Sequence, residues 1–422
     1  MGIALRPRKL LRRSLLGALV VGMLLHAGDT ADVYQAREAA APHLYDLVEW
    51  HVKNSLSKWA HRAFRALPWN STSSQEKRRQ LLEYFRLGSE FSALKSDLHE
   101  PIAGGAPDNV ERIEAHLDGV RASRREIRND VEETLEAAIS TVLAEQGLGL
   151  WGGLMLPPVD IRLIEPPKVL VTSPRDRIIR LHTVLVEPDL QVSEIEAIEE
   201  RLYNMSNISA LVLDIGGVAT YPASVRNDQP LRRTLGTSAH EWLHQYFFFR
   251  PLGRNMFDSR EMLSLNETVA GIAGKEIGDR ALVILGYGLD SLPSGSGLVA
   301  PTQSHGTAGD FDFSAEMQTT RRRVDELLDE GDVLAAESYM EERRSYFVAN
   351  GANVRKLNQA YFAFYGAYAE NPASVSPIGG QLHQLRDLMP DLGTFVRTVA
   401  SISSYRQLVD LLDELTSQPG AQ

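Results

Sequence analysis

The chain has 422 residues, of which 43% are hydrophobic and 23% are charged, and its formal net charge is −11. These ordinary fractions exclude a disordered or collagen-like chain, and the length allows roughly two or three domains at ~150 residues each. The absence of cysteine excludes disulfides, thiol nucleophiles and Cys-ligated metal centres, so any metal must be held by His, Asp or Glu. The acidic balance argues against nucleic acid as the main partner, because a phosphate backbone selects basic proteins.

Residues 1–28 have the order of a secretory signal, since basic residues crowd the start and an apolar run over 15–25 follows them. The run is shorter than the ~20 residues that cross a bilayer comfortably. The small residues around Ala27 and Ala31 do not form a clean cleavage site, so the segment is expected to be a cleaved signal or a signal-anchor, with a buried amphipathic helix as the alternative. The body of the protein is then exported or membrane-anchored, outside the cytoplasm, and contacts the membrane only through this segment.

The region 29–150 is expected to be helical. Helical patterns cover 43–64 and 75–98, with a Ser/Thr-rich break between them. After a Gly/Pro-rich break, Asp108 is expected to cap a third pattern whose apolar residues recur mostly at three-, four- and seven-residue steps up to about residue 148. This stripe predicts a long helix packed on the rest of the protein.

The region 151–282 is expected to be the core of the protein. Runs rich in β-branched residues predict strands at 161–164, 169–172, 178–187 and 208–216. A helix is expected over 192–203, a Gly-rich loop over 283–312 and a helical region over 313–422. The outline is an α+β, mostly helical fold, with a small sheet ahead of a helical core.

The strongest motif is His240-Glu241-Trp242-Leu243-His244. Residues four apart share one face of a helix, so both imidazoles can reach one ion at the ~2.0–2.1 Å that zinc prefers. Glu241 is offset by about 100° around the helix, which suits it to hold a water and take its proton. The alternative is an ordinary helix with two surface or core-edge histidines.

This helix has clear start and stop signals in the sequence. Asn227 and Asp228 are expected to cap it, Pro230 to lie in its first turn, and Arg250-Pro251 to end it.

Catalytic zinc needs a third protein ligand, and Glu267 is the candidate. It lies in a predicted helix where Ala270, Gly271 and Gly274 are small residues at three- and four-residue spacing. Small residues allow this helix to pack closely on the zinc helix, which brings the carboxylate into range. The other candidates are Asp258, Glu261 and Glu276, and Glu267 could instead be a solvated helix residue.

The HEWLH motif followed by Asn-Glu-Thr-Val-Ala at 266–270 resembles the gluzincin metallopeptidases, and most of all the bacterial predicted aminopeptidases of that superfamily. The resemblance is specific over residues 240–270 only. It implies that His240, His244 and Glu267 are zinc ligands, that Glu241 is the general base, and that the substrate is a peptide or protein.

The sequence departs from the superfamily's pattern in three places. The interval between His244 and Glu267 is longer than usual, which implies a longer loop over 248–259. The acidic residue that often lies four positions after the third ligand is Gly271 here, so another carboxylate is required to orient a histidine. The glutamate with which aminopeptidases grip a free amine is absent, which leaves open whether cleavage is terminal or internal.

The superfamily also binds the substrate main chain on an exposed edge strand. Residues 216–221 stand in the corresponding place, ahead of the zinc helix, and include Gly216 and Gly217. Glycines would let a peptide approach closely, whereas the alternative is an ordinary hairpin turn.

A hydrogen-bond donor across the zinc would stabilise a tetrahedral oxyanion. The aromatic-rich stretch 358–368 is expected to form a helix with Tyr361, Tyr365 and Tyr368 on one face. Tyr365 is the central member and the predicted donor, with the other two tyrosines and His305 as alternatives, although such a stripe can also be core packing. His182 is expected to be an ordinary strand residue.

The sequence therefore predicts a zinc metallopeptidase outside the cytoplasm. Two alternatives remain: a non-catalytic protein in which zinc ties helices together, and a membrane-bound scaffold in which the motif is accidental.

Overall fold

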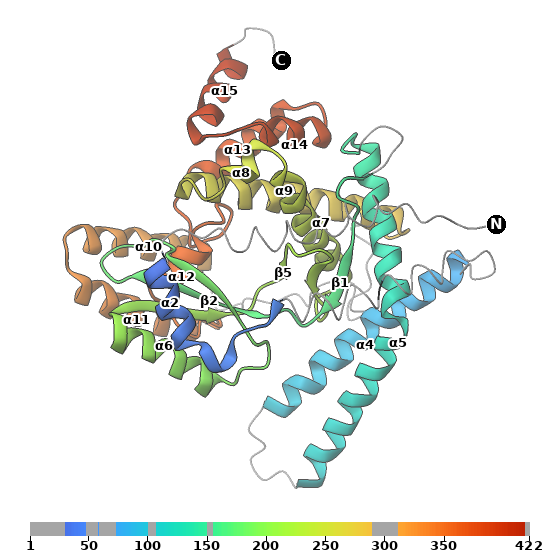
Figure 1. Cartoon of the computed structure of the whole chain (residues 1–422), viewed down its shortest axis with the longest axis horizontal. Coiled ribbons are helices and arrows are strands. Elements are labelled where there is room, and N and C mark those ends of the chain that lie inside the picture. Colours follow the sequence, from blue (N-terminus) through green and yellow to red (C-terminus); the bar gives the residue numbers. More distant parts are fainter. Residues whose placement is uncertain are drawn as a thin grey trace, which may run out of the picture.

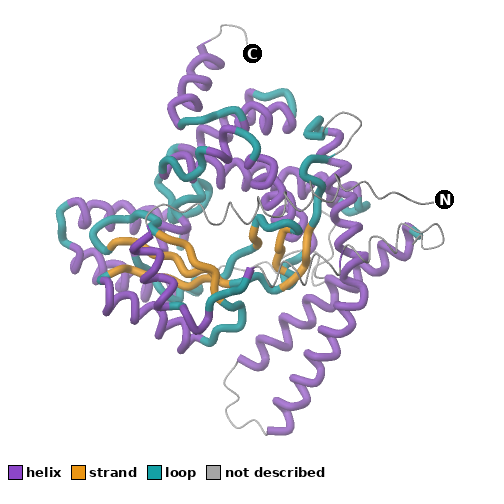
Figure 2. Tube along the Cα trace, viewed as in Figure 1, coloured by secondary structure: helices purple, strands orange, loops and turns teal. Residues whose placement is uncertain are grey.

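A computed structural model describes residues 30–47, 58, 73–99, 107–149, 155–288 and 311–417. Within these residues the protein is α+β and mostly helical, with two three-stranded sheets (Figures 1 and 2). The predicted fold class is therefore confirmed. The expected signal segment 1–28, most of the helix expected over 43–64, and His305 lie outside the described residues. No helix in the described part of the chain is long and apolar enough to span a bilayer.

The helices are α2 (Thr30–Ala39), α4 (Ser74–His99), α5 (Pro107–Glu145), α6 (Val192–Ser206), α7 (Leu231–Phe248), α8 (Pro251–Arg254), α9 (Arg260–Ile284), α10 (Phe313–Asp329), α11 (Val333–Ala349), α12 (Gln359–Tyr365), α13 (Ile378–Leu388), α14 (Leu392–Ala400) and α15 (Tyr405–Ser417), with the 3-10 turn η1 (Ala41–His43). The strands are β1 (Ile161–Ile164), β2 (Lys168–Pro174), β3 (His182–Val186), β4 (Ile208–Leu213), β5 (Gly217–Val218) and β6 (Ala223–Arg226).

Most of the predicted elements are confirmed, and the differences have local causes. The strand expected from residue 178 begins at His182, because the backbone just before it bonds to side chains. Arg260 donates to the carbonyl of Ile178, and Ser173 accepts from the amide that follows. The helix expected from residue 43 does not begin there, since η1 ends at His43 and Leu44 forms an isolated bridge to β3.

Two expectations near the helix that carries the HEWLH motif are also wrong. Asn227 and Asp228 do not cap α7, because Pro230 is its N-cap residue and Asp228 accepts two hydrogen bonds from Arg226 instead. The strand expected over 208–216 ends at Leu213, after which the chain enters the other sheet as β5 and β6. The sequence did not predict β6, whose four residues are too short a run to stand out.

The two sheets have different topologies. One has the order β3-β2-β4 and is antiparallel, whereas the other has the order β1-β6-β5 with β1 and β6 parallel. Alternate residues of β2 face opposite sides. Leu170 packs with α2 and α6, whereas Val169 and Val171 pack with α12. Helices therefore cover both faces of this sheet, which explains why the middle of β2 is apolar throughout.

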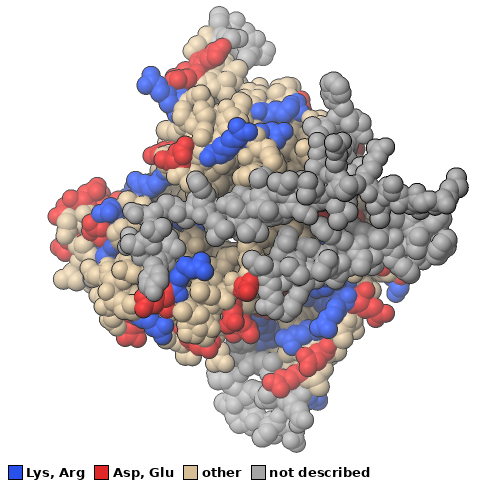
Figure 3. Space-filling view, viewed as in Figure 1, with Lys and Arg blue, Asp and Glu red and all other residues tan. Residues whose placement is uncertain are grey.

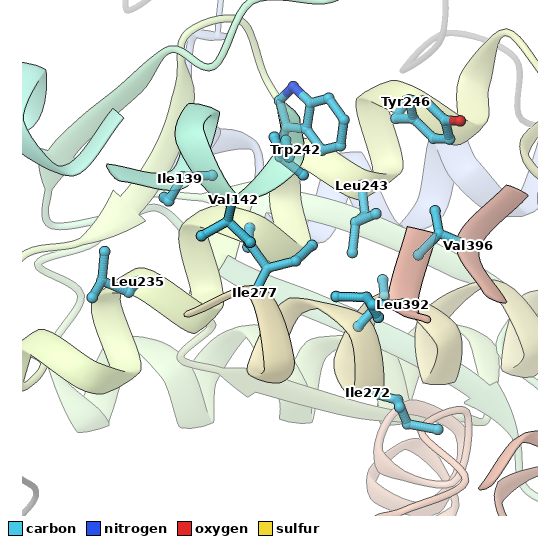
Figure 4. Packing of buried hydrophobic residues seen from close by; sticks show 14 of the residues in the cluster. Ile139, Val142, Leu235, Trp242, Leu243, Tyr246, Ile272, Ile277, Leu392 and Val396 are labelled. Carbon is cyan, nitrogen blue, oxygen red and sulfur yellow. The ribbon is translucent and has the colours of Figure 1, made fainter. Parts of the chain in front are cut away.

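The largest hydrophobic cluster lies around α7 and α9. Figure 4 shows side chains of α5, α7, α9 and α14 meeting in this cluster, among them Val142, Trp242, Ile277 and Leu392. Residues from the N-terminal and C-terminal helical regions thus share one core with the helix that carries the HEWLH motif. Such shared packing fixes the position of α7 on several sides.

Glycines hold α7 and α9 at close range. A Cβ added at Gly278 would lie 2.6 Å from the backbone nitrogen of Gly236, and one at Gly274 would lie 2.9 Å from that of His240. The predicted close packing through Gly274 is confirmed. Gly271 points elsewhere, with Glu370 as its nearest neighbour.

Gly278→Ala is therefore expected to destabilise the protein by ~1–3 kcal/mol, because the new methyl meets backbone atoms that cannot rotate away. Chemical denaturation of the purified protein measures this change. Gly119→Ala on α5 is the control: a Cβ there meets nothing within 4 Å, so a gain of ~0.5–1 kcal/mol is expected. Equal stability of the two variants would contradict a tight contact between α7 and α9.

Candidate metal centre

His240 and His244 lie one turn apart on the same face of α7. Their Nε2 atoms are 3.0 Å apart, and the two rings meet edge to face with centroids 4.6 Å apart. Both side chains are partly exposed, at 18% and 14%. The two ring nitrogens therefore point to one place that solvent can reach.

Glu267 of α9 completes the group. Its Oε2 lies 3.6 Å from Nε2 of His240 and 3.5 Å from Nε2 of His244. Two ligands held at ~2.0–2.2 Å by a tetrahedral zinc are about 3.3–3.6 Å apart. The two carboxylate–imidazole distances match this spacing, whereas the Nε2 atoms of the histidines, 3.0 Å apart, would have to separate by a few tenths of an ångström around a zinc ion. Among the described residues these three form the group that could hold a metal.

The other acidic candidates have different surroundings. Glu276 bonds to Arg280 and Arg386, and Glu261 lies in the first turn of α9, where Ser259 hydrogen bonds to it. Asp258 is exposed. None of these three carboxylates belongs to the group formed with His240 and His244.

Asn266 orients His244. Its Oδ1 lies 2.8 Å from Nδ1 of His244, and its Nδ2 donates to the carbonyl of Leu252 at 3.4 Å. Because the amide oxygen only accepts, Nδ1 keeps its proton when the ring is neutral, and Nε2 then has the lone pair that a metal needs. The sequence predicted a carboxylate in this role; at His244 a buried amide fills it.

The charges of the group favour a bound cation. Burial opposes a charged His244, but the carboxylate of Glu267 outweighs it and raises the pKa of His244 to about 9. Burial likewise opposes an ionised Glu267, whereas the two histidines hold its pKa well below the ordinary value. A metal entering the site replaces the imidazolium proton beside an ionised carboxylate.

Glu241 is only 6% exposed and lies next to this group. Burial raises the pKa of its carboxyl, the histidines oppose this rise, and Glu267 adds to it. A carboxyl with a raised pKa can take up a proton during a reaction and release it afterwards.

Strand β5 runs directly against Glu241. A Cβ at Gly217 would lie 2.7 Å from Oε1 of Glu241 and 2.8 Å from the carbonyl oxygen of Ser224, so only glycine fits. β5 is an edge of its sheet and pairs with β6 on one side. The predicted edge strand is thus present at Gly217–Val218, although residues 219–221 do not extend it.

The structure brings Tyr368, rather than Tyr365, next to Glu267 of the candidate metal centre. The helix expected to run to residue 368 ends at Tyr365, and the chain then turns so that the amide of Ala369 donates to Thr268 of α9 at 3.0 Å. Burial and Glu267, with which it hydrogen bonds, raise the pKa of the Tyr368 phenol well above its ordinary value.

Tyr365 lies in an aromatic cluster instead. Its ring lies beside that of Tyr361, with centroids 4.6 Å apart and the two planes tilted by 48°. Burial together with Asp214 raises the pKa of its phenol. In the sequence, Gly366 is the signal that the helix stops before Tyr368, because this glycine directly follows the end of α12.

Comparisons with known proteins found no family model, no curated protein and no solved structure that matches the chain. The arrangement of the site's own residues therefore carries the functional argument.

Asn266→Ala is expected to weaken zinc binding by roughly 10–100-fold, because His244 loses the partner that fixes its ring. Competition with a zinc-binding dye measures the affinity. Ser264→Ala on the same helix is the matched control, since the Ser264 hydroxyl is buried without a hydrogen-bond partner and its loss should leave zinc binding unchanged. Equal affinities in both variants would show that Asn266 does not position the ligand.

Proposed function

We propose that the protein is a zinc-dependent peptide hydrolase in which Glu241 is the general base. The observation that carries the proposal is the convergence of His240, His244 and Glu267 within 4.8 Å, with the buried carboxyl of Glu241 beside them. The donor set is that of catalytic zinc sites with two histidines and one glutamate.

Zinc held by these three residues would polarise the scissile carbonyl and make a water nucleophilic near neutral pH. Glu241 accepts the proton of the attacking water and passes it to the leaving amine nitrogen. The phenol of Tyr368 stays protonated, because its pKa is raised, and it can donate a hydrogen bond to the developing oxyanion.

The edge of β5 is suited to bind the substrate main chain. An extended peptide that pairs with a sheet edge gains main-chain hydrogen bonds and alternates its side chains. Because Gly217 has no side chain and lies against Glu241, a peptide there would pass close to the general base. This proximity supports a peptide over a small-molecule substrate.

A non-catalytic zinc site fits less well. Structural zinc takes four protein ligands, whereas catalytic zinc keeps a position for water. In the described part of the chain three ligating groups gather, and both histidines are partly exposed. The basic and apolar residues at the start of the sequence support a site of action outside the cytoplasm.

Glu241→Gln is expected to retain stoichiometric zinc and to lower kcat for peptide hydrolysis by ~10²–10⁴-fold, because the amide cannot accept a proton. Metal analysis and a fluorogenic peptide assay on the purified protein measure the two effects. Glu261→Gln, at the first turn of α9, is the control and should keep full activity.

Unchanged hydrolysis in Glu241→Gln would contradict the mechanism, and a wild-type protein without zinc would contradict the metal centre. The same assay with free and amino-blocked peptides separates terminal from internal cleavage. Equal cleavage of both would exclude an aminopeptidase.

Tyr368→Phe is expected to lower kcat by ~10²–10³-fold with little change in KM, since an oxyanion donor acts in the transition state. Tyr365→Phe is the matched control and should stay near the wild-type rate. A loss of kcat in Tyr365→Phe alone would assign the donor to the residue that the sequence favoured.

A further inference from the structure

A hollow lies away from the residues of the candidate metal centre. It has a volume of about 180 Å³ and is enclosed by α4, α5, the end of β1 and the segment between β6 and α7. None of its lining residues belongs to the metal centre. Nothing in the proposed reaction uses it.

The wall contributed by α5 is basic. Arg121, Arg124, Arg125 and Arg128 all line the hollow, and their spacing of three and four residues places them along one face of the helix. Figure 3 shows Lys and Arg side chains gathered over the α4–α5 hairpin, with acidic side chains beside them. In a protein with a net charge of −11, this concentration of arginine is unusual.

Two of the four arginines have carboxylate partners. Arg121 lies 3.0 Å from Asp118, and Arg128 lies 3.8 Å from Glu132. Glu132 is shared, because Lys58 and Arg162 also pair with it.

The other two, Arg124 and Arg125, lie within ion-pair distance of no carboxylate among the described residues. Glu165 also lines the hollow, but it pairs with Lys95 at 3.3 Å. Within the described part of the chain, two positive charges at the hollow therefore have no carboxylate as counter-ion.

Arg124 is the most informative of the group, because it is only 6% exposed. Its guanidinium lies over the ring of Tyr84 at 4.3 Å, and its Nη2 donates to the carbonyl of Asn227. Its Nε has no hydrogen-bond partner. A guanidinium cannot lose its proton to avoid burial, and a buried charge without a partner is costly.

Arg128 is likewise an arginine with a donor that has no hydrogen-bond partner. Its Nε is buried without a hydrogen-bond partner. Burial lowers the pKa of its guanidinium, Glu132 raises it, and the like charge of Arg162 lowers it further. Each of these two arginines thus lines the hollow and keeps a buried Nε without a hydrogen-bond partner.

We propose that this hollow binds the dianionic phosphate of a phosphate monoester or of inorganic phosphate. A phosphate monoester carries ≈ −1.5 to −2 charge at pH 7 and presents three acceptor oxygens, which suits the guanidiniums of Arg124 and Arg125, since neither has a carboxylate partner among the described residues. Bidentate arginine–phosphate contacts are among the stronger charge-assisted hydrogen bonds. A carboxylate ligand would neutralise only one of the two charges.

The test is a calorimetric titration of the purified full-length protein with inorganic phosphate at constant ionic strength, with chloride as the reference anion. Saturable binding is expected for phosphate and not for chloride. The side chain of Arg125 is exposed and can be changed without disturbing the core. Arg125→Gln should weaken phosphate binding by roughly tenfold or more.

Arg124→Met is the second variant, and it should abolish phosphate binding while keeping or raising the thermal midpoint in phosphate-free buffer, because a buried unpaired charge is removed. Arg86→Gln on α4 is the control, since Arg86 pairs with Glu83 and Glu90 on the exposed face. It should bind phosphate like the wild type.

Co-sedimentation with phosphatidylcholine vesicles that contain phosphatidic acid separates a lipid headgroup from a soluble phosphate. Binding to these vesicles that depends on Arg124 and Arg125, without binding of free phosphate, would support the site with a lipid as its source. Absence of both kinds of binding, or binding that neither substitution weakens, would overturn the proposal.

Discussion

The close contact between α7 and α9 is the constraint on which the candidate metal centre depends. Gly236 of α7 faces Gly278 of α9 with no space for a Cβ, and Gly274 fits against the backbone of His240. Glu267 lies about two turns before Gly274 on α9. The contact at Gly274 therefore fixes the position of Glu267 along the helix relative to the two histidines. A wider spacing between the helices would leave two imidazoles on one side and a carboxylate out of reach.

The edge of β5 is available to an added strand because the other sheet edges are covered. Glu136 and Glu132 of α5 accept from the amides of Ile161 and Leu163 in β1, at 2.9 and 2.7 Å. Residues 43–45 bond to β3, and Glu199 accepts from the amide of Val212 in β4 at 2.8 Å. Edges that are paired or blocked by charged groups resist strand addition. Among the described elements, β5 is the edge that no other element covers in this way.

The sequence predicted the features that depend on local periodicity. The four-residue spacing of the histidines and the small residues near Glu267 both report a helix face, and the structure has those helices. It missed Tyr368, because a helical pattern does not show that the chain leaves the helix at Gly366 and is then held by Thr268 of α9. It also missed Asn266, whose role depends on the tertiary fold that brings His244 within 2.8 Å.

The same reasoning separates a structural role of Arg124 from a binding role. Asn227 does not depend on Arg124 for its position, since its amide already donates to the carbonyl of Ile164 at 2.9 Å and α7 is held by its contact with α9. One carbonyl satisfies one donor, whereas a guanidinium has five. A residue needed only to hold Asn227 in place could be neutral, and it would avoid the free-energy cost of burying a charge. The contacts with Tyr84 and Asn227 use the ring-facing side and one donor of Arg124, and the proposed anion would account for the charge that these contacts leave unneutralised.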